Sequence, residues 1–304
     1  MTHAPTSADN FRGIVSLLLS QTLFVTSDSL IKMAGASLPA SQMMALRGLV
    51  AVLLAFSILV YTVDRSRWRL AFQPMVAMRA VLEALAAGLF IMSLQHLTLA
   101  AITVLMQVTP LTITILSALV LGQAVGWRRW TAIITGFFGV TLVAQPGGES
   151  FSWYYVSALS VALLMSVRDL LTRRLDPHIP TAAVTLSTTA SVCVLGVAGM
   201  PFQTWAAVTP PAFGLLAASA VLVTAANVFV IRAFRHVDVT VVSPFRYFGV
   251  LWGLLLSYLV WRDVPNLLAC AGMVLIVGSG LYTMHRETIG RRQPEKPPRT
   301  PPNP

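Results

Sequence analysis

The stretch TLAAITVLMQVTPLTITILSALVL, residues 98–121, carries no Asp, Glu, Lys or Arg over its 24 positions. A bilayer core of roughly 30 Å is crossed by about 20 helical residues, so this stretch is long and apolar enough to span a membrane. Nine more long apolar stretches lie before or after it in the chain. The ten expected spans run 13–33, 40–62, 74–94, 98–121, 126–145, 152–172, 180–200, 211–233, 239–260 and 264–284. The sequence therefore predicts an all-α integral membrane protein with ten transmembrane helices.

The composition of the chain agrees with a lipid environment. Of its 304 residues, 56% are hydrophobic and 11% are charged, whereas soluble domains average about a quarter charged residues. The linkers between the spans are too short for a soluble domain, so we expect the protein to act within the bilayer. Lys32 and Lys296 are the only lysines, which excludes a pump built on a P-loop. Cys193 and Cys270 lie singly in apolar runs, so we expect neither a metal site nor a cofactor.

The basic residues predict the orientation. If the N-terminus is cytoplasmic, fifteen of the 21 Lys and Arg residues lie on the cytoplasmic side and two lie outside. Basic residues collect in cytoplasmic loops, so the formal charge of +10 indicates membrane topology rather than nucleic-acid binding. Both termini are predicted to be cytoplasmic. The N-terminal tail is expected over 1–12, and a basic, Pro-rich and disordered tail over 286–304.

The two halves of the chain are weakly similar to each other. The segment 27–32 (SDSLIK) matches 168–173 (RDLLTR) at a shift of 141, and 95–98 (QHLT) matches 235–238 (RHVD) at a shift of 140. The repeats are expected over 13–145 and 152–285, with five spans in each. Because five is odd, equivalent positions lie on opposite membrane faces, which makes the repeat inverted. Inverted repeats are typical of secondary transporters that open their site alternately to the two sides.

At this point the chain resembles the drug/metabolite transporter superfamily in its ten-helix form with two EamA-type repeats. The resemblance covers about 11–285 and rests on 101–104 (AITV) leading through Pro110 to 119–123 (LVLGQ), and on 239–244 (VTVVSP) leading to 261–263 (WRD). Gly122-Gln123 and Arg262-Asp263 stand where the family usually has Gly-Glu. The resemblance implies a permease rather than an enzyme, in a bacterial cytoplasmic membrane.

The resemblance also implies a substrate range of amino acids, nucleotide derivatives, sugars and drugs. The pair Arg246-Tyr247, followed by Gly253 and Asp263, looks most like branches that move amino acids or S-adenosylmethionine. We therefore expect a transporter of an amino acid or a derivative, with export favoured by family analogy. Transport of S-adenosylmethionine or a nucleotide derivative and multidrug efflux are alternatives. A passive channel or an intramembrane enzyme is a remote alternative.

Ionisable side chains within the spans are the first candidates for function, because each costs roughly 2.5–3.5 kcal/mol to insert. Glu83 lies near the middle of the third span, one helical turn from Arg79. Two interpretations are open. The two residues form an i,i+4 ion pair that neutralises both, or Glu83 faces the cavity and binds a proton or a substrate amine.

Arg246 lies in the ninth span directly after Pro244 and Phe245. A proline frees a carbonyl group and allows a bend, and a guanidinium beside a bend is suited to bidentate binding of a carboxylate or phosphate. The alternative is an arginine that extends to the inner surface. Tyr247 and Trp252 are candidates for an aromatic cavity wall, or structural aromatics.

Two further pairs are candidates for gates. Arg47 is expected to pair with Asp28 near the outer end of the first span. Asp169, the repeat equivalent of Asp28, lies beside Arg168 near the cytoplasmic end of the sixth span. Two equivalent acids near opposite faces suggest latches for an outer and an inner gate, with solvation of helix ends as the alternative.

Neutral amides complete the candidate site. Gln21, Gln107 and Asn227 lie within spans and offer hydrogen bonds to substrate, although interhelical contacts explain such amides equally well. The expected partners are a small-molecule substrate and the lipid bilayer. Proton coupling, and the choice between a monomer and a homodimer, remain open.

Overall fold

The computed structural model describes residues 7–122, 126–146, 152–172, 174–176, 178–233 and 242–292, and these contain helices and no strand. The first half of the chain forms α1 (Ser7–Ala34), α2 (Ala40–Thr62), the 3₁₀ helix η1 (Arg65–Phe72), α3 (Pro74–His96), α4 (Leu99–Met106), α5 (Thr109–Leu121) and α6 (Trp127–Ala144). The second half forms α7 (Tyr154–Thr172), α8 (Thr181–Ala198), η2 (Met200–Phe202), α9 (Pro210–Ala233), η3 (Ser243–Tyr247), α11 (Phe248–Trp261) and α12 (Leu267–Arg292). The all-helical prediction is confirmed for these residues.

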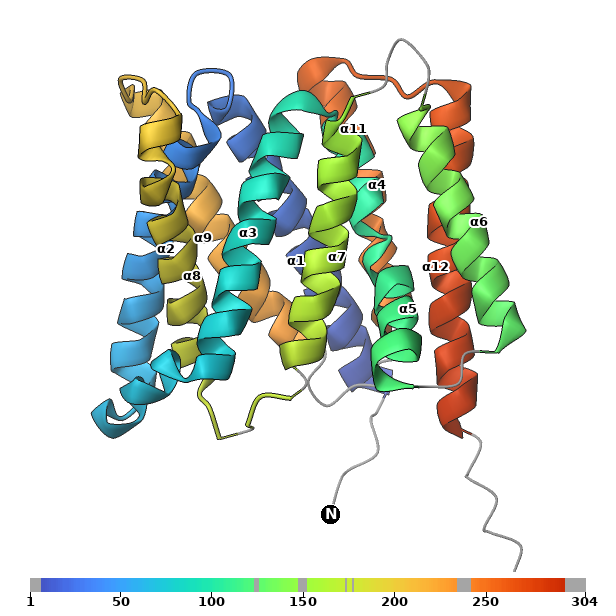
Figure 1. The fold of residues 1–304 in the computed structure, drawn as a ribbon, viewed down its shortest axis with the longest axis horizontal. Coiled ribbons are helices and arrows are strands. Elements are labelled where there is room, and N and C mark those ends of the chain that lie inside the picture. The colour runs from blue at the N-terminus through green and yellow to red at the C-terminus, as the bar shows by residue number, and fades with distance from the viewer. Residues whose placement is uncertain are drawn as a thin grey trace, which may run out of the picture.

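Seven helical segments of the described chain are long and apolar enough to cross a membrane, with α4 and α5 counted as one. Helices α6, α11 and α12 lie at the three remaining expected positions and do not reach that measure. The protein is therefore built for insertion into a membrane, while the count of ten spans stays a prediction. The described ends of the chain, in α1 and α12, lie at the same face of the bundle (Figure 1). That this face is cytoplasmic also stays a prediction.

Some boundaries differ from those expected. The fourth expected span is two helices, α4 and α5, and the ninth begins with η3. Helix α12 continues to Arg292, so 286–292 are helical rather than part of a disordered tail. Residues 1–6 and 293–304, Gln123 and the repeat segment 235–238 lie outside the described residues.

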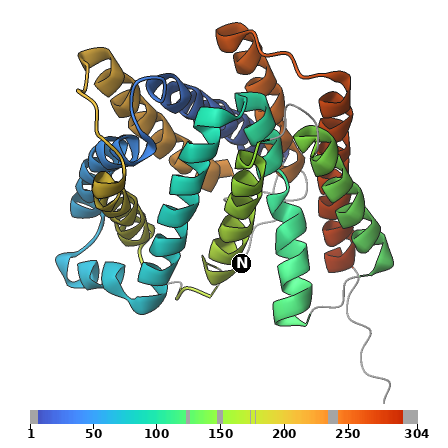
Figure 2. The same ribbon diagram turned by 45° about the horizontal axis from the view of Figure 1, so that its top comes forward.

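The helix packing has the symmetry of the repeat. Helix α3 packs on α7 as α9 packs on α1, and α3 packs on α8 as α9 packs on α2. The pairs α2 with α8 and α6 with α12 map onto themselves when the halves are exchanged. Figures 1 and 2 show α6 and α12 together at one edge of the bundle and α2 and α8 at the opposite edge. The main interhelical contacts thus join one half of the chain to the other.

A proline explains the helix break in the fourth expected span. Pro110 lies in the first turn of α5, where its missing N–H cannot bond to the carbonyl of Met106. The hydroxyl of Thr109 donates to that carbonyl instead, at 2.7 Å. Gly122 caps the C-terminus of α5 and Arg262 caps that of α11, both with left-handed backbone (φ 63° and 59°). These residues are 140 apart, so the two repeats end equivalent helices in the same way.

Small residues bring α6 and α12 into backbone contact. A Cβ placed on Gly139 would lie 2.7 Å from the carbonyl oxygen of Gly272, and a Cβ on Gly272 would lie 2.5 Å from that of Gly139. Close packing of this kind is the main source of helix association in lipid. The glycines of this edge are therefore structural.

Candidate functional site

The irregular junctions of the two halves meet in the bundle. Gln107 lies between α4 and α5, is buried, and its side-chain amide donates to the backbone carbonyl of Arg246 in η3 at 3.4 Å. A shift of 140 places Tyr247 at the position equivalent to Gln107. Both residues occupy non-helical or 3₁₀ junctions, so each half contributes one irregular segment to the same region. Transporter sites are commonly built where helices are interrupted in this way.

Tyr247 is an unusual side chain in this region. It is 7% exposed, and its hydroxyl is buried without a hydrogen-bond partner among the described residues. Gly280 of α12 allows this placement, because a Cβ there would overlap the tyrosine hydroxyl. An unbonded buried hydroxyl costs about 1–3 kcal/mol of stability. It is therefore either a structural defect or a group that forms its hydrogen bond with a ligand.

Three more predicted residues lie on this side of the bundle. Gln21 of α1 lies against Gly249 of α11, where a Cβ would come within 2.7 Å of the glutamine oxygen. The indole of Trp252 donates to the hydroxyl of Thr26 at 3.2 Å. The side chain of Arg246 is exposed and forms no ion pair within the described chain. Arg246 is therefore an available cation beside the junction of η3 and α11.

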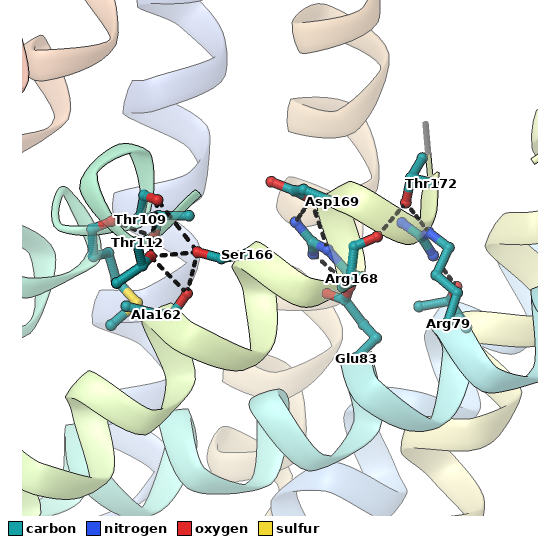
Figure 3. Close-up of polar contacts among 11 residues, drawn as sticks. Arg79, Glu83, Thr109, Thr112, Ala162, Ser166, Arg168, Asp169 and Thr172 are labelled. Atoms are coloured by element: carbon teal, nitrogen blue, oxygen red, sulfur yellow. Dashed lines mark hydrogen bonds and ion pairs between the residues drawn. The ribbon is translucent and has the colours of Figure 1, made fainter. Parts of the chain in front are cut away.

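A second cluster joins α3 to α7, as Figure 3 shows. Arg168 of α7 forms an ion pair with Glu83 of α3 and a second ion pair, at 2.6 Å, with its neighbour Asp169. The side chains of Arg168 and Glu83 are 16% and 24% exposed. The ion pair of Glu83 is thus with the other half of the chain, and not with Arg79 as the i,i+4 spacing suggested.

Arg79 has different partners. Its guanidinium donates to the hydroxyls of Thr172 in α7 and Thr188 in α8, each at 2.8 Å (Figure 3). The i,i+4 pair of α3 therefore faces the second half of the chain, each residue with its own partners. Arg79 bridges three helices, which the sequence did not predict.

Hydroxyl groups form a neighbouring contact between α5 and α7. Thr112 and Ser166 are hydrogen-bonded to each other and are buried, and Ser166 also donates to the carbonyl of Thr109 at 3.2 Å (Figure 3). Polar contacts of this side of the bundle thus extend from α8 across α7 to the broken α4–α5 span.

Another cation contacts the opposite end of α3. Lys32 of α1 donates to the carbonyls of Leu94, at 2.9 Å, and Leu97 at the end of α3. Its ammonium also lies 5.5 Å from the ring centre of Trp261 at the end of α11. Nearby, His96 stacks on Tyr154 of α7 with ring centres 3.8 Å apart. Both contacts with aromatic rings link the first half to the second.

The predicted outer latch differs from the expected ion pair between Arg47 and Asp28. Arg47 donates to the hydroxyl of Ser27 at 3.4 Å, and an ion pair of Arg47 with Asp28 is not among those of the described residues. Ser27 in turn donates to the carbonyl of Ser219 in α9 at 3.0 Å. The α1–α9 contact is therefore held by hydroxyl groups, whereas the equivalent α3–α7 contact contains an ion pair.

Asn227 is the one predicted amide that does not join the others. Its side chain is exposed and donates to the carbonyl of Val223 on its own helix at 2.8 Å. The sequence reasoning also missed Lys32, Thr172 and Thr188. The position of Lys32 near the end of a span was a signal for it, whereas the two threonines carried none.

No group of three or more His, Cys, Asp or Glu side chains that could hold a metal occurs in the part of the chain that the structure describes. The site therefore consists of hydrogen-bonding and ionic side chains of the two halves.

Comparison with known proteins gives consistent results. Residues 11–145 and 152–284 each match the EamA-like transporter family. The pseudopaline exporter CntI of Pseudomonas aeruginosa strain UCBPP-PA14 is 28% identical over 271 residues, which cover 87% of this chain and 93% of the exporter. The S-adenosylmethionine uptake transporter of Rickettsia conorii is 25% identical over 63% of this chain and 66% of its own. A solved crystal structure with 19% identity superposes with a TM-score of 0.64 over 94% of this chain and 99% of its own, which shows the likeness of fold.

Proposed function

Because this chain belongs to the EamA-like transporter family, we propose that it is a secondary transporter that exports a small metabolite by alternating access. It is an integral membrane protein that carries small molecules, and its family and relatives are transporters rather than enzymes. Export by alternating access, and the identity of the metabolite, are the parts that we propose.

One observation supports alternating access above the others: the two halves are in contact at two levels of the same helix, α3. Glu83 of α3 binds Arg168 of α7, and His96, thirteen residues further along α3, stacks on Tyr154 of α7. Thirteen residues of helix correspond to about 20 Å. In the proposed cycle, one set of contacts opens while the other stays closed, so the substrate site faces one side at a time.

For the substrate we propose an amino acid or an amino-acid derivative. Arg246 supplies an exposed guanidinium for a carboxylate, and Gln107 and the unbonded hydroxyl of Tyr247 supply hydrogen bonds. Transport of S-adenosylmethionine is the second candidate, because relatives that are S-adenosylmethionine uptake transporters match this chain. That compound also carries an amino-acid group, so the same residues would serve either substrate.

The test is counterflow in proteoliposomes. Proteoliposomes that contain the purified protein are loaded with unlabelled phenylalanine. Entry of labelled phenylalanine is then measured in the presence of competing amino acids, S-adenosylmethionine or nucleotide sugars. We expect saturable counterflow, which a channel does not give. Absence of counterflow with every amino acid and with S-adenosylmethionine would refute the proposed substrate class.

The role of Arg246 is tested by comparing a competitor that has a free carboxylate with its methyl ester. We expect the ester to compete poorly in the wild type. The variant Arg246→Gln should lower the affinity for the free acid about tenfold or more, since hydrogen bonds to charged groups contribute about 1.5–3 kcal/mol. Arg128→Gln is the matched control, because Arg128 is exposed at the start of α6 beside Trp127. Equal effects of both variants would refute a role of Arg246 in carboxylate binding.

We also propose the cytoplasmic membrane of a bacterium as its location, because the named relatives are bacterial. Proton coupling is proposed through Glu83, whose carboxylate could take a proton when its ion pair opens. A pH gradient imposed on the proteoliposomes should then drive accumulation in the wild type and not in Glu83→Gln.

A further inference from the structure

An apolar groove lies on the outside of the bundle between η1, α3 and α8. It encloses about 420 Å³, a volume typical of small-molecule pockets. Its walls are mainly alanine, serine and aliphatic side chains: Ala71, Phe72, Ala77, Val81, Ala84, Leu85, Ser187, Ala190, Ser191, Val194, Leu195 and Ala198. Val81, Leu85 and Val194 are 53%, 43% and 66% exposed. Exposed aliphatic walls on transmembrane helices face lipid, so the groove is open to the bilayer.

The groove follows much of the length of α8. Its wall extends from Ser187 to Ala198, eleven residues or about 16 Å of helix. This wall lies across the middle of the span Thr181–Phe202. One extended acyl chain therefore fits along the groove, with one end near Ala71 and Phe72.

The end of the groove at Ala71 and Phe72 belongs to a basic, aromatic segment. Helix η1 is the short light-blue helix between α2 and α3 at the lower left of Figure 1, and it connects the ends of two membrane-crossing helices. It carries Arg65, Arg67, Trp68 and Arg69. Such a combination of arginine and tryptophan is typical of the interface between lipid headgroups and water.

The protein holds η1 firmly in place. Trp68 packs beside the buried cluster of Leu59, Ala71 and Ala183, and its indole donates to the carbonyl of Val63 at 3.0 Å. Arg67 donates to the backbone carbonyl of His178 in the α7–α8 connection. The segment is thus tied to both halves of the chain, and its position relative to the groove is fixed.

Two arginines of η1 remain available for a ligand. Arg69 is exposed and has no polar partner among the described residues, while Arg65 is exposed with its guanidinium 6.0 Å from the ring centre of Trp68. Asp64 is the only acid in 63–73, so this segment has a net charge of +2. A positive site at the headgroup level beside an apolar groove on the surface of the bundle is complementary to an anionic phospholipid.

We propose that this groove binds an anionic phospholipid, with one acyl chain along α8 and the phosphate against Arg65 and Arg69. The site is outside the substrate region between the halves, so it is independent of the transport proposal. Because η1 contacts α3 and α8, which belong to different halves, the bound lipid touches both halves.

The test uses the fluorescence of Trp68 in nanodiscs of phosphatidylcholine. Either dibrominated phosphatidylglycerol or dibrominated phosphatidylcholine is added as a quencher, and the Trp68 signal is the difference between wild type and Trp68→Phe. We expect phosphatidylglycerol to quench at a lower mole fraction than phosphatidylcholine. A lipid-facing arginine contributes about fivefold to such a preference, so Arg65→Gln with Arg69→Gln should lower the preference about 25-fold at low salt.

Matched controls test the role of the headgroup charge, the role of the groove, and whether a second chain covers the groove. Arg128→Gln should leave the preference unchanged. Ala190→Phe, which fills the groove, should weaken quenching by both lipids, whereas Ala218→Phe on an exposed face of α9 should not. Equal quenching by both lipids in the wild type, or a preference that survives loss of both arginines, overturns the proposal. So does a groove covered by a second copy of the chain, seen as protected Trp68 in nanodiscs that contain two chains.

Discussion

The ion pair between Glu83 and Arg168 gives the sharpest prediction about conformational change. In Glu83→Gln the side chain keeps its shape and its acceptor oxygen but loses its charge. Exposed ion pairs contribute about 0.2–1 kcal/mol and breaking a buried one costs about 3–5 kcal/mol. This pair is partly exposed and keeps a hydrogen bond in the variant, so we expect a loss of about 1.5 kcal/mol from the contact between α3 and α7. Arg168 is not left unpaired, because Asp169 remains 2.6 Å away. We therefore expect the separated state of α3 and α7 to gain about tenfold in population.

The measurement is the distance between spin labels on the two helices, by double electron–electron resonance in nanodiscs. Met75 in the first turn of α3 and Arg174 after α7 are both exposed, and they are replaced by labelled cysteines after Cys193→Ala and Cys270→Ala. We expect a longer distance to become populated in Glu83→Gln.

Asp169→Asn is the control for this experiment. It also removes a charged partner of Arg168, but this partner is the neighbouring residue on the same helix, so the contact between α3 and α7 stays. The distance should then remain that of the wild type. An unchanged distance in Glu83→Gln, or the same lengthening in both variants, would refute the assignment of the Glu83–Arg168 pair as a link that opens.

Three other predictions follow from contacts elsewhere. Lys32→Met removes the donor to the carbonyls of Leu94 and Leu97 and should increase thiol labelling of a cysteine at position 97 from the side opposite the termini, whereas the neighbouring Met33→Ala should not. Tyr247→Phe should leave the melting temperature unchanged or raise it, because the lost hydroxyl has no partner among the described residues. The same variant should lower the affinity for substrate in the counterflow assay about fivefold. Unchanged affinity would exclude the hydroxyl from the site. Gly139→Ala should cost about 1–3 kcal/mol of stability in thermal unfolding, because its Cβ would meet the backbone of Gly272, whereas Gly278→Ala, with open space around it, should cost nothing; equal effects would contradict the backbone contact.

Much of the fold could be predicted from the sequence, because membrane insertion depends on local composition. The local signals are spans of about 20 apolar residues, the position of Pro110 and the glycines of α6 and α12. The structure has helices at the spans, a helix break near Pro110 and close packing at the glycines. The extent of α12 could not be predicted, because the polar residues 286–292 carry no apolar signal although they continue the helix to Arg292.

The partners of the charged residues were harder to predict, because they depend on packing between helices far apart in sequence. The i,i+4 spacing of Arg79 and Glu83 made an intrahelical pair the simplest prediction. The packing of α3 on α7 and α8 instead offers Arg168 to Glu83 and two threonine hydroxyls to Arg79. Threonines within a span carry no distinguishing pattern, so Thr172 and Thr188 could be identified only from the structure.

The repeat symmetry gives a reason to expect unequal gates. The α3–α7 contact and its equivalent in the repeat, α9–α1, differ in chemistry: the first contains the Glu83–Arg168 ion pair and the second the Ser27–Ser219 hydrogen bonds. Charged contacts in a largely desolvated interface are stronger than contacts between hydroxyls. Two states that exchange these interfaces therefore differ in free energy, and the state that keeps α3 on α7 is the more stable one without substrate. In the proposed cycle, binding of substrate must supply that difference, so we expect the charge of Glu83 to affect how tightly transport is coupled to binding.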